Sequence, residues 1–374
     1  MNLLIVAILL SIIPAIVYLI YILGSLTTKN PPVPKLESLP VISIVVPAYN
    51  EESVIESRIK NIAESYPIEL FELIIANDAS TDNTKNVATE VMRKLNINGK
   101  VVSNEQRSGV NFTVNHGVSE ASNEIIVLTG ADGQFDKNTI PTLLAVLLSS
   151  DDIGAVSGDL VPVSYKKVVT TRSEDAYRSI YGKICTWESS IHSTYCFNGP
   201  VTALKKSARV NVHVTKGADD ASTALGIIRN GYRCLYVPDA KFYEYIPSSF
   251  KEHKRQKIRR ATRLLEATFV NRDLLSPKFG KFGTVVFPLR ILMLFICPFL
   301  TFASIVLWFI ILIQTHLLLG IAFALILGSL LFIGNIKTNI VSSFIFYQIY
   351  LLIGLINMFR DVHIWEPTER INHR

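Results

Sequence analysis

Three acidic groups and one basic group stand out in this 374-residue chain as side chains able to do chemistry. The acidic groups are Asn77-Asp78-Ala79-Ser80-Thr81-Asp82, Gly130-Ala131-Asp132 and Asp219-Asp220, and the basic group is Gln256-Lys257-Ile258-Arg259-Arg260. Carboxylates can ligate a divalent metal, hydrogen-bond a ribose or accept a proton. Guanidinium groups can bind phosphates, often through two parallel hydrogen bonds. Together these groups indicate chemistry on a diphosphate-bearing substrate such as a nucleotide-sugar.

The four groups lie on a polar segment that apolar stretches bound on both sides. Leu3 to Leu23 carries no charge and is long enough to cross about 30 Å of hydrocarbon. No Lys or Arg precedes it and its apolar core exceeds that of a signal peptide, so we expect a retained anchor. The first basic residue after it is Lys29, which predicts an external N-terminus and a cytoplasmic domain after the anchor.

The C-terminal part of the chain contains three further apolar stretches. They are Ile291 to Ile313, His316 to Gly334 and Ile340 to Phe359. If all three crossed the membrane, the tail with Arg360, Arg370 and Arg374 would lie outside, against the positive-inside trend. We therefore expect one of them to be interfacial or re-entrant, without knowing which. Thr284 to Leu289 is expected to belong to an interfacial helix.

The composition excludes several classes of protein. A net charge of +6 suits contact with anionic lipid and diphosphate, and we expect no nucleic-acid partner because the basic residues cluster beside the apolar stretches. A transporter is disfavoured because those stretches carry almost no ionisable residues. The four cysteines have no paired or metal-ligand spacing, so we expect free, buried thiols.

The polar segment shows strand and helix patterns in alternation. Expected strands are Val41 to Val46, Phe71 to Ala76, Lys100 to Ser103 and Glu124 to Leu128, and expected helices are Glu51 to Glu64, Thr81 to Lys94 and Val110 to Ala121. This alternation predicts an α/β fold with a parallel sheet. Asp78 and Asp132 each follow a strand, where ligands of such sheets bind. The absence of a glycine-rich phosphate loop argues against an NTPase or a dehydrogenase.

Several motifs, taken in order, resemble those of the family-2 glycosyltransferases over roughly residues 41 to 263. Val46-Pro47-Ala48-Tyr49-Asn50-Glu51-Glu52 resembles the family's opening motif, and residues 77–82 resemble its Asp-Asp-Gly-Ser-x-Asp motif. Residues 129–132 stand where its Asp-x-Asp motif is expected, and Phe197-Asn198-Gly199-Pro200 resembles an acceptor-side loop. Asp219-Asp220 stands at its Glu-Asp position, and Gln256-x-x-Arg259-Arg260 resembles Gln-x-x-Arg-Trp.

The resemblance implies a GT-A fold, a mostly parallel α/β sheet, flanked by transmembrane helices. The expected organisation is an anchor over 1–27, a linker over 28–40, the glycosyltransferase domain over 41–250, basic and interfacial helices over 251–290, two or three membrane helices over 291–360, and a tail over 361–374.

The same resemblance assigns the donor site. It implies that Ala48, Tyr49, Glu51 and Asp78 line the nucleotide pocket, although Asp78 alone would also suit a helix cap or a turn. Asp132 would ligate Mg²⁺ or Mn²⁺ on the sugar diphosphate, while Gly130 replaces the family's first Asp. Alternatively, Asp132 has only a structural role, as a turn residue before Gly133.

Asp220 is the expected general base, and Asp219 is expected to raise its pKa or to face elsewhere. A register shift of one would make Asp219 the base, and capping of a helix over Ala221 to Arg229 is a compatible role. Gln256, Arg259, Arg260 and Arg263 fall on one helix face suited to a diphosphate. Asn198, Gly199 and Pro200 are the expected acceptor residues, and Arg260 replaces a Trp of processive relatives.

We therefore expect an inverting, metal-dependent, multi-pass membrane glycosyltransferase with a cytoplasmic active site. The donor would be a UDP- or GDP-sugar, and the acceptor a hydroxyl of a membrane-borne or lipid-linked glycan. Two alternatives stay open: transfer of one sugar to a polyprenyl phosphate, and a membrane subunit that binds nucleotide-sugars without catalysis. Gly130 and Arg260 motivate the second alternative.

Overall fold

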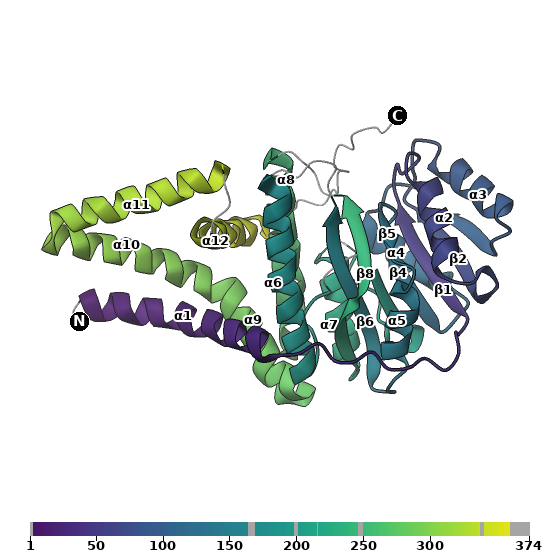
Figure 1. The fold of residues 1–374 in the computed structure, drawn as a ribbon, viewed down its shortest axis with the longest axis horizontal. Helices are drawn as coiled ribbons and strands as arrows, with labels where there is room; N and C mark the ends of the chain where they lie inside the picture. The colour runs from purple at the N-terminus through teal and green to yellow at the C-terminus, as the bar shows by residue number, and fades with distance from the viewer. Residues whose placement is uncertain are drawn as a thin grey trace.

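The structure is a computed structural model that describes residues 3–163, 169–197, 201–214, 216–245, 250–336 and 340–359. A sheet covered by helices forms one end of the molecule, and long helices project from it at the other end (Figure 1). The four cysteines are free and buried, as expected.

Eight strands form one mixed sheet in the order β3-β2-β1-β4-β7-β6-β8-β5. They span β1 Ile42–Ala48, β2 Phe71–Asn77, β3 Gly99–Ser103, β4 Ile125–Thr129, β5 Gly133–Phe135, β6 Ile153–Val163, β7 Val201–Lys205 and β8 Arg233–Tyr245. The half that contains β1 to β4 is parallel, as the alternation predicted. β7 runs antiparallel to β4 and β6, and β5 runs antiparallel to β8, so the sheet is mixed.

Helices cover both faces of the sheet. On one face lie α2 Ile55–Ser65, α3 Thr84–Lys94 and α5 Thr139–Leu147, and on the other lie α4 Val110–Ser119 and α7 Asp219–Arg229. The apolar residues of β1 divide between the two cores, since Ile44 and Val46 join the first and Val45 the second. This division follows from the alternation of side chains along a strand.

Two predicted helix starts are wrong in the same way. α2 begins at Ile55 and α3 at Thr84, several residues after the expected Glu51 and Thr81. In both places the residues after the strand instead form a connecting loop whose polar groups bond to the neighbouring loop. That pairing outweighs the local preference for helix.

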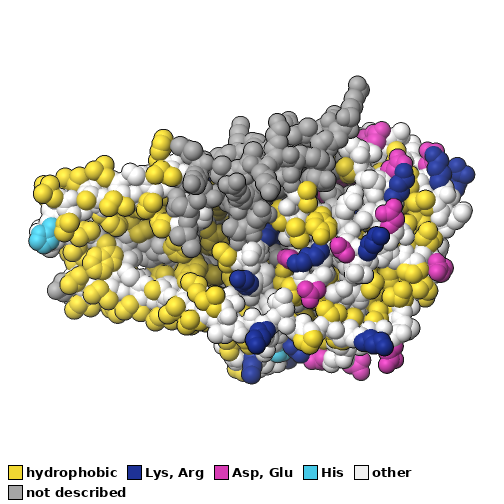
Figure 2. All heavy atoms as spheres, viewed as in Figure 1, with side chains coloured by type: hydrophobic (Ala, Val, Ile, Leu, Met, Phe, Trp, Pro, Cys, Tyr) yellow, Lys and Arg dark blue, Asp and Glu magenta, His cyan; other side chains and the backbone are white. Residues whose placement is uncertain are grey.

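The remaining helices form the second part of the molecule. They are α1 Leu3–Thr27, α6 Val169–Ile191, α8 Phe250–Val270, α9 Phe287–Ile291, α10 Cys297–Thr315, α11 Leu317–Ile336 and α12 Ile340–Asn357. Single turns of 3-10 helix occupy Ile68–Leu70, Lys206–Ala208, Arg272–Leu274 and Pro277–Phe279. Leu3–Thr27 and Phe282–Thr315 are long and apolar enough to cross a membrane. Figure 2 shows an almost continuous hydrophobic surface over α1, α10 and α11.

Thr284 to Leu289, which we expected to belong to an interfacial helix, lies within one long helical run, and its interfacial position stays a prediction. π-helical turns at Phe282–Val286 and Leu292–Ile296 flank α9, and the helical run continues without interruption to Thr315. Prolines at 288 and 298 stand in this run. A wider turn is a common way for a helix to continue past a residue that lacks an N–H.

The last apolar helix, α12, differs in direction from the others. In Figure 1 it is seen almost end-on, whereas α1, α10 and α11 lie across the view. It packs along α8, where a Cβ on Gly354 would lie 3.0 Å from the backbone nitrogen of Thr262. The glycine therefore permits a close approach of the two helix backbones.

Candidate active site

The loops that follow β1 and β2 bind each other through backbone and side-chain groups. The Asn50 N–H donates to Ser80 Oγ at 3.0 Å, and the Glu51 N–H donates to Thr84 Oγ1 at 2.8 Å. Ala48, at the end of β1, pairs with Asn77 at the end of β2. The predicted nucleotide residues Ala48, Tyr49 and Glu51 are thus held beside Asp78, at the carboxyl edge of the sheet.

Asp78 is buried and its carboxylate accepts three hydrogen bonds. Oδ1 accepts from Asn104 Nδ2 at 2.8 Å and from the Ser108 N–H at 2.7 Å, and Oδ2 accepts from the Gly109 N–H at 2.9 Å. Asp78 therefore fixes the loop that enters α4. A carboxylate has about four acceptor positions, so one position on Oδ2 remains for a ligand.

The loop fixed by Asp78 covers Tyr49. The guanidinium carbon of Arg107 lies 4.0 Å from the centre of the Tyr49 ring, a cation–π arrangement. Arg107 therefore covers the aromatic face that a nucleobase would stack on. The sequence motifs do not include Arg107.

Arg58 lies buried under the loop that carries Asp132. Its Nε donates to the Gly130 carbonyl at 3.0 Å and its Nη2 to Thr129 Oγ1 at 2.5 Å. The guanidinium also lies 4.0 Å from the centre of the Phe135 ring. Burial lowers the pKa of Arg58 to about 9, and the nearby negative charge of Asp132 partly offsets this decrease. Arg58, which no sequence motif contains, thus holds the loop that carries Asp132.

Asp132 is exposed to solvent, although many protein atoms lie around its carboxylate. Burial raises its pKa, and the charges of Arg58 and Arg260 oppose that rise. Gly133 follows because a Cβ there would lie 2.0 Å from the Phe242 ring on β8. The Asp-Gly pair therefore marks a close approach of β5 and β8 as well as a turn.

Asp219 and Asp220 are the first two residues of α7, and its N-cap is Ala218. The expected capping role over a helix from Ala221 is therefore wrong, although Asp220 Oδ1 accepts from the Ala221 N–H at 2.7 Å. Burial and then the charge of Asp219 raise the pKa of Asp220 to about 6. Burial also raises the pKa of Asp219. The negative charge of each carboxylate thus makes ionisation of the other less favourable.

The arginines of α8 crowd one another beside these carboxylates. Burial and the charges of Arg260, Arg255 and Arg263 lower the pKa of Arg259 to about 10. The charge of Arg260 lowers the pKa of both Asp132 and Asp220, so it lies near both acidic groups. Gln256, one turn earlier, is half-buried. Excess positive charge of this kind is suited to bind a diphosphate.

The structure thus brings Asp132, Asp220 and Arg260 together from distant parts of the sequence. The predicted acceptor residues Asn198, Gly199 and Pro200 lie outside the described residues. Arg178 on α6, which no motif contains, also lowers the pKa of Asp220. Its sequence signal is only the helical spacing of Arg178, Tyr181, Cys185 and Glu188.

A divalent metal fits this site only with help from a ligand. Among the described residues no three His, Cys, Asp or Glu side chains come together to hold an ion. Asp132 offers one carboxylate to such an ion. One or two protein oxygens are enough for Mg²⁺ when phosphates complete its shell.

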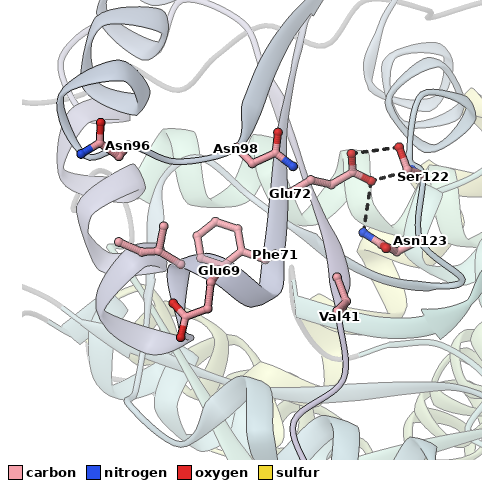
Figure 3. A pocket seen from close by; sticks show the side chains of 9 residues that line it. Val41, Glu69, Phe71, Glu72, Asn96, Asn98, Ser122 and Asn123 are labelled. Atoms are coloured by element: carbon pink, nitrogen blue, oxygen red, sulfur yellow. Dashed lines mark hydrogen bonds between the residues drawn. The ribbon is translucent and has the colours of Figure 1, made fainter.

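One cavity lies away from these acidic groups. A depression of about 400 Å³ is lined by Val41, Ile68, Glu69, Phe71, Glu72, Asn96, Asn98, Ser122 and Asn123, at the amino ends of β1 and β2. In Figure 3 the Glu72 carboxylate points to Ser122 and Asn123, and it accepts from the Ser122 N–H at 2.5 Å. Its acceptors are used by the protein, and the depression is on the sheet edge opposite the acidic groups.

Comparison with protein families gives two overlapping matches. Residues 43–206 match the model described as glycosyl transferase family 2, and residues 125–333 match the model described as glycosyl transferase family group 2.

Two curated relatives show the same likeness. The chain is 25% identical over 238 residues to a probable glycosyltransferase of Bacillus subtilis, YdaM, covering 60% of this chain and 55% of that protein. It is 26% identical over 268 residues to the poly-beta-1,6-N-acetyl-D-glucosamine synthase of Staphylococcus aureus, covering 71% and 63%. The match therefore spans less than two thirds of the length of either relative.

One solved structure shares the fold over nearly the whole chain. The mannosyltransferase PcManGT from Pyrobaculum calidifontis, solved with GDP-Man and Mn²⁺, superimposes with a TM-score of 0.80. The identity is 23%, and the match covers 97% of this chain and 100% of that one. At this identity the likeness concerns the fold, which is of the GT-A type.

Proposed function

Because the chain belongs to the family-2 glycosyltransferases, we propose that it transfers a sugar from a UDP- or GDP-sugar to a hydroxyl group of a membrane-borne or lipid-linked glycan. The observation that carries this proposal is the convergence on Arg260 of Asp132, on the metal side of the site, and Asp220, on the base side. A donor diphosphate and an acceptor hydroxyl need these two kinds of group next to each other.

The donor half of the site uses the loops after β1 and β2. Tyr49 would stack the nucleobase once Arg107 moves from its ring, and the remaining acceptor position of Asp78 would bind a base or ribose donor. The crowded guanidinium groups of Arg259 and Arg260 would bind the diphosphate. A Mg²⁺ or Mn²⁺ ion, with Asp132 as its protein carboxylate, would stabilise negative charge on the leaving diphosphate.

The acceptor half of the site uses Asp220 as general base. Its carboxylate takes the proton of the acceptor hydroxyl while that oxygen bonds to the anomeric carbon. The bond from the anomeric carbon to the diphosphate oxygen breaks, and the nucleoside diphosphate leaves with the electron pair. One displacement inverts the anomeric configuration. A pKa of about 6 suits a base that is ionised at neutral pH and still holds a proton well.

The position of α12 supports a specific membrane topology. We infer that α1, Phe282–Thr315 and α11 cross the membrane and that α12 lies along its surface against the basic helix α8. Three crossings from an external N-terminus leave the sheet domain and the tail, with Arg360, Arg370 and Arg374, in the cytoplasm. This arrangement removes the conflict that four crossings would create.

The test is release of nucleoside diphosphate and sugar transfer by detergent-purified protein. UDP-glucose, UDP-N-acetylglucosamine and GDP-mannose serve as donors, with Mg²⁺, Mn²⁺ or EDTA, and octyl β-D-glucoside or undecaprenyl phosphate as acceptors. We expect metal-dependent transfer from one donor to the hydroxyl acceptor. Asp220→Asn should lower that transfer by about 10²-fold or more, the usual range for a general base.

Two outcomes would contradict the proposal. Transfer to undecaprenyl phosphate that Asp220→Asn leaves intact would assign the phosphate acceptor, which needs no base because it is already anionic. Nucleotide binding without turnover on either acceptor would assign a binding subunit.

A further inference from the structure

A fully buried ion pair joins α6, which packs on the sheet, to α9, which belongs to the long apolar helical run Phe282–Thr315. Arg290 of α9 donates from Nε to Glu188 Oε1 at 2.5 Å, and the two side chains are 1% and 0% exposed. α6, which carries Glu188, stands between the sheet and the projecting helices (Figure 1). The pair therefore lies at the boundary between the two parts of the molecule.

The N-terminal helix closes this pair from a third side. Tyr21 of α1 donates its hydroxyl to Glu188 Oε1 at 3.3 Å, and its ring centre lies 5.4 Å from the Arg290 guanidinium. The Tyr21 and Trp187 rings meet edge to face at 5.2 Å, and a Cβ on Gly24 would lie 2.3 Å from Trp187. α1 is thus packed closely on α6 beside the pair.

The second oxygen of Glu188 holds the chain that leads to the predicted acceptor loop. Oε2 accepts from the backbone N–H of Tyr195 at 3.1 Å. The Tyr195 ring centre lies 5.1 Å from the Arg290 guanidinium, and its hydroxyl bonds to Thr268 of α8. Residues 194–197 are therefore fixed from α6, α8 and α9, and they run directly into residues 198–200.

The same segment borders the proposed base. Burial and then the charge of Asp220 raise the pKa of Cys196, so the two side chains lie near each other. Cys185 of α6 and Thr194 both direct donors to the Cys196 carbonyl, at 3.8 and 3.1 Å. One stripe of α6 thus runs from Arg178, near Asp220, to Glu188, near Arg290.

Stability alone is a poor reason for such a pair. Removing two charges from water costs several kcal/mol per ion, and apolar residues of similar volume often serve as well or better. Here Arg290 Nη2 is also buried and has no hydrogen-bond partner among the described residues, which adds to the cost. The feature that apolar residues would lose is the direct bond from Glu188 to Tyr195.

We propose that Glu188 and Arg290 are positioning residues for the acceptor, which fix residues 194–197 beside Asp220 by anchoring them to the membrane helices α1 and α9. This role rests on the proposed function. It predicts that the pair controls use of the acceptor, while donor binding, which depends on the opposite side of the site, is independent of it.

The test compares Glu188→Gln with the double variant Glu188→Met/Arg290→Met in the full chain. The single variant leaves a buried arginine unpaired, whereas the double variant removes both charges and keeps similar volume. Asp273→Asn is the matched control, because it breaks an exposed pair with Arg229 on α7 at 2.5 Å. Exposed pairs contribute little to stability.

Steady-state kinetics distinguish an effect on acceptor binding from an effect on donor binding. For both variants we expect the KM for octyl β-D-glucoside to rise about tenfold or more, while the KM for donor and the acceptor-independent hydrolysis of donor stay within about twofold. The double variant should recover the melting temperature that Glu188→Gln loses, without recovering the acceptor KM. Recovery of both together, or equal losses for donor and acceptor, would overturn the positioning role.

Hydrogen–deuterium exchange gives a measurement that needs no activity. Amides of residues 194–197 should exchange faster in both variants, while those of β1 Ile42–Ala48 exchange at the unaltered rate. In the Asp273→Asn control, the exchange of residues 194–197 should not change. Unchanged protection of residues 194–197 would overturn the proposal even in an active enzyme. If the unaltered protein shows no transfer or hydrolysis with any donor, the proposed function fails, and exchange still decides the structural part of the inference.

Discussion

The Arg58 Nε donates to the carbonyl of Gly130 at 3.0 Å, beneath the residue where the family motif has its first Asp. A buried cation therefore lies next to the position from which a carboxylate is missing. We expect Gly130→Asp to lower the Mn²⁺ concentration for half-maximal turnover several-fold, because a second carboxylate would join Asp132. Gly130→Asn, of equal size and no charge, is the control, and an equal effect of both changes would contradict this reading.

Ionisation of the Asp219–Asp220 pair should control both rate and stability. Because the pKa of Asp220 is raised to about 6, transfer should rise with pH around an apparent midpoint near 6 and then level off. The raised pKa means that ionising Asp220 costs more free energy in the folded protein than in the unfolded chain. Ionised Asp220 therefore destabilises the fold fully above about pH 6, and this effect is absent below about pH 4, where the carboxyl group is protonated in both states. Asp220→Asn should therefore increase the free energy of unfolding at pH 8 by roughly 1–3 kcal/mol. Chemical denaturation at pH 4 and pH 8 checks this, and an equal gain at both pH values would refute it.

The crowded arginines of α8 should determine diphosphate affinity. Arg259→Ala or Arg260→Ala should weaken binding of UDP or GDP, whichever the donor contains, by about 10- to 100-fold, because each loses a charge-assisted hydrogen bond. Lys254→Ala, an exposed residue on the same helix, should change the affinity little. Isothermal titration calorimetry at two salt concentrations measures this, and a comparable loss for Lys254→Ala would indicate a general charge effect.

The contact between α12 and α8 depends on Gly354. A Cβ at this position would lie 3.0 Å from the backbone nitrogen of Thr262, closer than ordinary van der Waals contact. Gly354→Leu should therefore lower the free energy of unfolding by roughly 1–3 kcal/mol and reduce activity, because the larger side chain displaces α8. Gly328→Leu on α11 is the matched control, because a Cβ there meets no atom within 4 Å in the part of the chain that the structure describes. Thermal unfolding in detergent would show the difference, and equal effects of the two changes would argue against close packing of α12 on α8.

Ala79 holds a left-handed backbone conformation, with φ of 55°, at a position where the family motif has Gly. A side chain makes this conformation unfavourable by about 1–2 kcal/mol. Ala79→Gly should therefore raise the free energy of unfolding by roughly 0.5–1 kcal/mol once the entropy of glycine is included. Ala63→Gly in α2 should lower it by a similar amount. Urea unfolding compares the two, and a loss of stability at position 79 would show that the loop relaxes.

The sequence by itself determined the classes of element and the order of the acidic and basic groups. The apolar run Ile42–Ala48 predicted a buried strand, and Leu3–Thr27 predicted a helix long and apolar enough to cross a membrane, because hydrophobic patterning acts locally along the chain. Asp78 and Asp132 follow strands as predicted, and the order and spacing of the motifs alone indicated the family.

Only the tertiary structure decided which charges meet. α2 and α3 begin later than predicted because the loops around Asn50 and Ser80 bind each other. This is a long-range contact, which local helix propensity does not indicate. No motif contains Arg58, Arg107 or the Glu188–Arg290 pair. Their long-range contacts, Arg58 with Gly130, Arg107 with Tyr49 and Glu188 with Arg290, join residues at least 58 positions apart in the chain. Burial, which raises the pKa of Asp220, is a property of the assembled protein and not of any one segment.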